Sequence, residues 1–123
     1  MTCILLLFLG NSTKCVIWNY DIFGFDSGRT RQMADFIAAH GYLVVIPDYY
    51  RGEFDDLSDP TKTVQFLKDQ SQWFNREIYQ TESVPPIGRL QLDFLNVLEY
   101  LKNQGCKTIG TIGTCWGTYP VIR

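Results

Sequence analysis

Residues 107–118 read KTIGTIGTCWGT, a β-branched run that leads directly into the pattern Gly113-x-Cys115-x-Gly117. The run predicts a buried strand, and the two glycines predict a crowded, strained bend at which the strand turns into a helix. A side chain at the apex of such a bend stands above the sheet, with the N-terminus of the following helix directed at it. This arrangement is a nucleophile elbow, and here it would present the thiol of Cys115.

A five-residue pattern also occurs by chance, and most isolated cysteines are small buried hydrophobic residues. On the pattern alone, a reactive Cys115 and a buried structural Cys115 are equally good interpretations. The other segments of the chain distinguish between these two interpretations.

The composition is that of an ordinary globular domain, with 46% hydrophobic and 20% charged residues in a chain of 123. A chain of this length can build one hydrophobic core. Its 11 basic residues form no cluster and are outnumbered by 13 acidic residues, which argues against a nucleic-acid partner. Neither Gly-x-Gly-x-x-Gly nor Gly-x-x-x-x-Gly-Lys occurs, so a nucleotide-binding domain is disfavoured and we predict no cofactor.

The chain has four cysteines, Cys3, Cys15, Cys106 and Cys115, and a single histidine. No Cys-x-x-Cys pair and no Cys/His cluster is present, so we predict no metal site. Because a chain with this much apolar content can build a core without cross-links, we also predict no disulfide framework and a reducing, cytoplasmic compartment.

The apolar run from Cys3 to Leu9 resembles a targeting segment only superficially. It lacks a basic region before it and is far too short to span a bilayer. We predict an edge strand, or a remnant at the start site, rather than a signal peptide, and no membrane partner.

The next segments predict a strand at 15–20, a helix at 30–40 and a strand at 42–46. The second strand is a continuous apolar run, which is typical of a parallel strand buried on both faces. Strand, helix and strand in this order predict a right-handed crossover.

Three features describe the predicted helix at 30–40. Asp26 or Ser27 is the expected N-cap, and Gly41 occupies the position at which a helix ends with a left-handed residue. Met33, Ile37 and the neighbouring alanines are expected on the buried face.

Two further helical patterns separate this unit from the bend. The first opens with Asp59-Pro60 as N-cap and first helical residue, and the second follows Pro85-Pro86 and ends at Gly105. The whole order predicts an α/β domain with a mainly parallel sheet and flanking helices.

Three separated segments together resemble the dienelactone hydrolase (carboxymethylenebutenolidase) family of the α/β-hydrolase fold. They are Tyr20-Asp21-Ile22-Phe23-Gly24, Ile46-Pro47-Asp48-Tyr49-Tyr50 and Ile112-Gly113-Thr114-Cys115-Trp116-Gly117. Their order and spacing also match, over residues 14–118. The resemblance implies a hydrolase that cleaves a lactone or small carboxylic ester, with this small molecule as its partner.

The resemblance also implies roles for four residues. Cys115 would be the nucleophile, and the backbone N–H groups of Ile22 and Trp116 would form the oxyanion hole. Asp21, where bacterial members of the family have Glu, would accept the thiol proton. The alternative for Asp21 is a loop aspartate that caps nearby backbone N–H groups.

A thiol nucleophile of this kind needs a histidine and an acid, which in this fold follow the nucleophile along the chain. The residues after Cys115 include neither Asp nor His. His40, in the last turn of a predicted helix, is expected to face solvent and not the thiol. We therefore expect residues 1–123 to form a single partial α/β-hydrolase domain whose C-terminal half is missing and which is inactive alone.

Two other interpretations stay open. A non-catalytic remnant or interaction module would keep the bend without the chemistry. Class I glutamine amidotransferases also use Gly-x-Cys-x-Gly, but they lack an Asp-Ile-Phe-Gly loop after the preceding strand and rank lower. The sequence predicts neither the natural substrate nor the oligomeric state.

Overall fold

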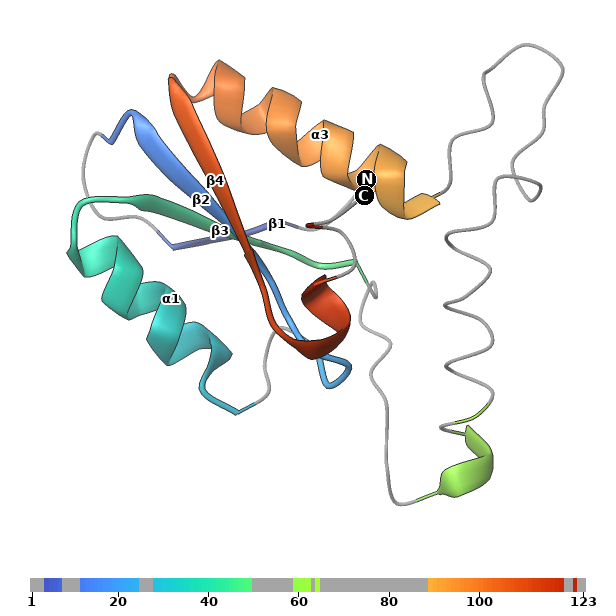
Figure 1. The fold of residues 1–123 in the computed structure, drawn as a ribbon. Helices are drawn as coiled ribbons and strands as arrows, with labels where there is room; N and C mark the ends of the chain where they lie inside the picture. Colours follow the sequence, from blue (N-terminus) through green and yellow to red (C-terminus); the bar gives the residue numbers. More distant parts are fainter. Residues whose placement is uncertain are drawn as a thin grey trace, which may run out of the picture.

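A computed structural model describes residues 4–7, 12–24, 28–49, 59–62, 64, 89–118 and 121 of the chain. These residues form a four-stranded sheet with helices on both faces (Figure 1). The elements are β1 (Ile4–Leu7), β2 (Lys14–Asn19), α1 (Thr30–Ala39), β3 (Leu43–Pro47), α3 (Arg89–Asn103), β4 (Thr108–Gly113) and the 3₁₀ turn η2 (Cys115–Gly117).

Among the described residues, the strand order in the sheet is β1-β3-β2-β4. β2 runs parallel to both β3 and β4, whereas the short β1 pairs antiparallel with β3 at one edge. The mainly parallel α/β sheet and the N-terminal edge strand are therefore confirmed.

The two central strands, β2 and β3, separate two halves of the core because successive side chains of a strand point to opposite faces. α1 packs its Ala34 and Ala38 on one face, and α3 packs its Val97 and Leu101 on the other. On the α1 face the strands contribute Val16, Trp18, Val44 and Ile46, and on the α3 face Cys15, Ile17, Leu43 and Val45. Both faces of β3 are buried throughout, as its continuous apolar run predicts.

The buried face of α1 agrees with the predicted one except at Met33. Ala34 and Ala38 are buried and Ile37 packs partly against the core, whereas Met33 is 47% exposed. Residues 34 and 38 share one helix face, and residue 33 lies about 100° away from residue 34 around the axis. The small alanines allow the helix to approach the sheet closely.

The ends of the helices agree only in part with the sequence. α1 has Arg29 at its cap position without a side-chain cap bond, and the predicted caps Asp26 and Ser27 lie outside the described residues. Gly41 has φ 88, as a helix-ending glycine should. Asp59 Oδ1 accepts the Thr61 N–H at 3.0 Å, which confirms the predicted cap there.

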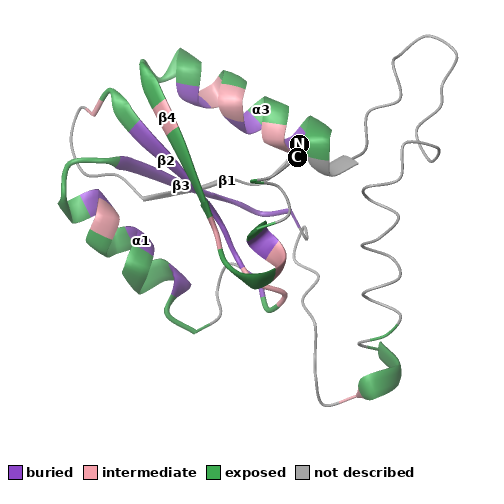
Figure 2. Ribbon diagram, viewed as in Figure 1, coloured by how far each residue is buried: buried purple, intermediate pink, exposed green. Residues whose placement is uncertain are grey.

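β4 was predicted to be buried, and this is wrong for the described residues. All six of its residues are exposed or half-buried, as Figure 2 shows. Within the described part of the chain β4 pairs only with β2, so it forms an edge of the sheet. A β-branched run predicts a strand but does not report which position in the sheet that strand takes.

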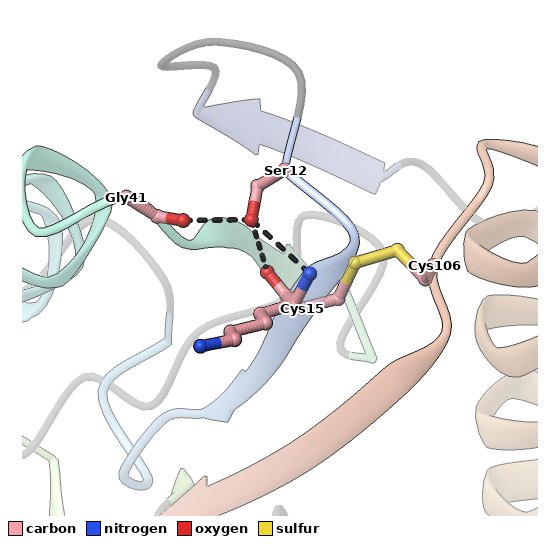
Figure 3. The surroundings of a disulfide bond; sticks show 5 residues. Ser12, Cys15, Gly41 and Cys106 are labelled. Carbon is pink, nitrogen blue, oxygen red and sulfur yellow. Dashed lines mark hydrogen bonds between the residues drawn. A yellow bond between two sulfur atoms is a disulfide. The ribbon is translucent and has the colours of Figure 1, made fainter.

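The prediction that the chain lacks disulfides is also wrong, because Cys15 and Cys106 are joined (Figure 3). Cys106 lies between α3 and β4, where the chain returns to the sheet, and the Lys107 N–H donates to Thr13 O at 2.7 Å. This contact holds the start of β4 beside the start of β2, although the two cysteines are 91 residues apart. The spacing of the cysteines along the sequence does not show that these two lie close together in space. Because the prediction of a reducing compartment assumed that disulfides are absent, that argument no longer holds.

The disulfide should contribute to stability because it closes a loop across most of the chain. We expect Cys106→Ser to lower the free energy of unfolding by about 2–4 kcal/mol, since the cross-link restricts the unfolded ensemble. Urea unfolding followed by circular dichroism, with and without reductant, measures the difference. Cys3→Ser, which removes a cysteine outside this bond, is the matched control, and equal unfolding midpoints for all three chains would contradict the expectation.

The turn between β4 and η2 leaves no room for a side chain at either of its glycines. A Cβ on Gly113 would collide with the backbone of Gly117 and lie 2.8 Å from Thr118 N, and a Cβ on Gly117 would collide with the backbone of Asn19. At Gly110, in the middle of β4, a Cβ would meet only Cys15 O at 4.0 Å.

We therefore expect Gly117→Ala to destabilise the chain by about 3 kcal/mol, because the backbone has to move to accept the methyl group. Gly110→Ala is the matched control and should change the free energy of unfolding by less than about 1 kcal/mol. Urea titrations of the two variants give both values. Similar losses in the two variants would show that the bend is not as tightly packed as its geometry indicates.

Candidate active site

Cys115 lies at the apex of the bend between β4 and η2. Its φ is 52, the only positive φ of a non-glycine residue in the described part of the chain, and its free thiol is exposed. This conformation is strained for a residue with a Cβ and persists only where the surroundings enforce it. The sequence therefore located the bend and its apex correctly, and the chain turns there into a short 3₁₀ segment.

Hydrogen bonds on both sides hold Cys115 in this conformation. The Thr114 N–H donates to Asn19 O at 3.2 Å, which ties the residue before the apex to the end of β2. The Gly117 N–H donates to Thr114 O at 2.9 Å, and the Thr118 hydroxyl donates to Cys115 O at 2.7 Å. These bonds close the turn directly around the thiol.

The loop after β2, residues 20–24, lies against the bend. The close approach of Gly117 to the backbone of Asn19 and Tyr20 places the start of this loop beside η2. The Ile22 N–H donates no hydrogen bond to another residue that the structure describes. The predicted donors of the oxyanion hole, Ile22 and Trp116, thus belong to two segments that pack together.

Asp21 is half-buried and caps its own loop. Its Oδ1 accepts the Phe23 N–H at 3.0 Å, and its carbonyl oxygen accepts the Gly24 N–H at 3.2 Å. This is the capping arrangement that the sequence allowed as the alternative to a base. Capping by one carboxylate oxygen and acceptance of a proton are compatible roles, because a carboxylate has two oxygens.

Three aromatic rings join the segments that carry the family resemblance. Trp116 of η2 stacks on Tyr20 with ring centroids 6.2 Å apart and an interplanar angle of 16°. Tyr49, after β3, contacts both rings with centroids 5.9 Å away. The loop after β2, the loop after β3 and the bend therefore meet at one edge of the sheet, where the parallel strands end.

A buried polar network under these rings was not predicted from the sequence. The Tyr49 hydroxyl donates to Asn19 Oδ1 at 2.6 Å, and both residues are fully buried. Burial raises the pKa of Tyr49 well above its ordinary value of 10.0, and nearby Tyr20 and Asp93 raise it further. Asp93 is also buried. It lies four residues before Val97 on the inner face of α3, and this spacing is the sequence feature that could have indicated its burial.

His40 lies far from this edge, as predicted. It follows α1, and its Nδ1 is 2.7 Å from Phe36 O while its ring packs on Phe36. The residue is exposed and lies shortly before the start of β3, whereas Cys115 lies just after the end of β4, which runs in the same direction. The two side chains are thus at opposite ends of the sheet.

In the ranges that the structure describes, no three His, Cys, Asp or Glu side chains gather in a way that could hold a metal ion. No helix of those ranges combines the length and apolar character needed to cross a bilayer.

Known proteins are similar to this chain over nearly its whole length. Residues 7–122 match the model of the dienelactone hydrolase family. The carboxymethylenebutenolidase homolog of Rattus norvegicus is 34% identical over 123 residues, which covers 89% of this chain and 44% of that protein. Its counterpart in Xenopus tropicalis is 35% identical, covering 87% of this chain and 39% of that protein.

A solved structure named m3DLH has the same fold, with a TM-score of 0.58 over 93% of this chain at 18% identity. The match covers 42% of that chain. This chain therefore spans less than half the length of the relatives it matches. Within that span, the three converging segments and the family match agree: the chain belongs to the dienelactone hydrolase family.

Proposed function

We propose that this chain carries the acyl-accepting part of a hydrolase that cleaves a lactone or small carboxylic ester, with Cys115 as the nucleophile. The observation that carries this proposal is the exposed free thiol on a strained bend, packed against the loop after β2. A conformation with positive φ costs stability at a non-glycine residue, so its presence at a thiol favours a role in chemistry over a role in packing.

The first half of the reaction would transfer the acyl group to sulfur. The thiol proton passes to the Asp21 carboxylate, the sulfur forms a bond to the carbonyl carbon, and the carbonyl oxygen becomes negative. The N–H groups of Ile22 and Trp116 would stabilise this oxygen, and one such donor typically contributes about 3 kcal/mol. The C–O bond then breaks, and the leaving oxygen takes the proton from Asp21.

The second half would be hydrolysis of the thioester. Water adds to the acyl carbon, the C–S bond breaks, and the carboxylic acid leaves while the thiol is restored. This step needs a group that activates water, usually a histidine oriented by an acid, and no Asp or His follows Cys115 in these 123 residues. We propose that the chain by itself forms the thioester without turning it over.

This proposal predicts a stable acyl adduct on one cysteine. We expect brief treatment with p-nitrophenyl acetate to add a single acetyl group at Cys115, because an exposed activated thiol attacks the ester and the adduct then persists. Intact-mass spectrometry detects the adduct, and its removal by hydroxylamine identifies a thioester. Release of p-nitrophenol should stop after about one equivalent per chain.

Two variants make the labelling experiment specific. Cys115→Ala should remove the adduct, and Cys3→Ser, the matched control, should leave it unchanged. Equal labelling of the Cys115→Ala chain would contradict the assignment of the nucleophile. No labelling of the unaltered chain would favour the alternative that it is a non-catalytic interaction module.

The role of Asp21 can be separated from its capping bond by comparing two substitutions. Asn can still accept the Phe23 N–H but cannot take a proton, whereas Ala does neither. If Asp21 is the base, Asp21→Asn should slow acylation of Cys115 by about 10²-fold near pH 7.

Asp21→Ala provides the comparison for stability. It should lower the free energy of unfolding by about 1 kcal/mol through loss of the cap, while Asp21→Asn should not. Stopped-flow acylation near pH 7 and urea unfolding measure the two effects. An unchanged acylation rate in Asp21→Asn would leave only the capping role.

A further inference from the structure

We propose that Asn19 is a positioning residue that sets the place of Cys115 relative to the loop carrying Ile22. The inference rests on the proposed function, because it concerns the geometry of the acylation step. Asn19 is the last residue of β2, and its side chain is fully buried.

The side-chain amide of Asn19 connects the ends of three strands. Its Nδ2 donates to Thr111 Oγ1 at 2.8 Å and to Ile112 O at 3.0 Å, and both acceptors lie near the end of β4, just before the bend. Its Oδ1 accepts the Tyr49 hydroxyl at 2.6 Å, from the segment after β3. Both amide hydrogens and the amide oxygen therefore form hydrogen bonds. Among neutral side-chain groups, only an amide carries two N–H donors and a carbonyl acceptor together.

The backbone of Asn19 contacts the bend on both sides of Cys115. Its carbonyl oxygen accepts the Thr114 N–H at 3.2 Å, and Gly117 packs directly on the same carbonyl group. In the β2–β4 ladder, Asn19 is the partner of Gly113. One residue thus contacts the positions before and after the thiol.

The same residue also starts the loop that carries the proposed oxyanion donor. Only two residues separate Asn19 from Ile22, so a shift of Asn19 moves the Ile22 N–H and the bend relative to each other. Acylation depends on this relative position, because an N–H group has to meet the oxygen while the sulfur meets the carbon. Simple alkylation of the thiol has no such oxygen and does not depend on it.

This difference separates a positioning role from a purely structural role. Asn19→Asp keeps the shape and an acceptor for Tyr49 but loses both donors to β4. We expect it to slow acylation by p-nitrophenyl acetate about 10²-fold, since a displacement of about 1 Å costs a reaction that much. Alkylation of Cys115 by iodoacetamide should change by less than about threefold, because that reaction needs an accessible thiolate but no oxyanion donor.

A second variant keeps the test decisive if Asn19→Asp does not fold. Tyr49→Phe removes one hydrogen bond to the amide and should slow acylation about tenfold, again with little change in alkylation. Tyr42→Phe, at a residue 37% exposed, is the matched control and should change neither rate. Circular dichroism establishes that each variant is folded.

The outcomes separate this inference from the proposed function. If the unaltered chain is not acylated at Cys115, the proposed function fails. If the unaltered chain is acylated and the folded variants of Asn19 and Tyr49 react as fast as it does, only the positioning role is overturned. Parallel loss of acylation and alkylation would also overturn it, because that result shows a general change in access to the thiol.

Discussion

The hydrogen bonds of one buried amide, that of Asn19, hold the carboxyl edge of the sheet together. The side chain lies between β4 and Tyr49, where a polar group without partners would cost about 1–3 kcal/mol. Because every polar atom of the amide has a partner, the ends of β2 and β4 and the loop after β3 have one compatible arrangement. That arrangement determines the positions of the bend at Cys115 and of the loop at Ile22.

The strain at Cys115 is sustained by hydrogen bonds and close packing on both sides of the residue. Positive φ at a residue with a Cβ costs about 1–3 kcal/mol, and the surroundings have to offset it. Here Gly113 and Gly117 allow backbone segments to touch, and Trp116 stacks on Tyr20. The packing that forces the thiol outward also brings a second chain segment, the loop after β2, to its side.

The sequence predicted features that depend on neighbouring residues more reliably than features that depend on distant ones. The buried strand β3, the end of α1 at Gly41, the cap at Asp59 and the bend at Cys115 each follow from a local pattern. The pairing of Cys15 with Cys106 and the contacts of Asn19 involve partners as far as 93 residues apart. A polar residue at the end of an apolar run indicates a strand end, but it does not indicate what the side chain will bind.

The disulfide and the Asn19 amide act on the same pair of strands from opposite ends. Cys15 and Cys106 join the chain where the β2–β4 ladder begins, and Asn19 joins it where the ladder ends at Gly113. β4 pairs on only one side within the described residues, so these two links limit its sliding along β2. A shift of one residue would turn every side chain of β4 to the other face and would separate Thr111 from Asn19. The register of this ladder therefore determines where the thiol is presented, and the two links fix the register.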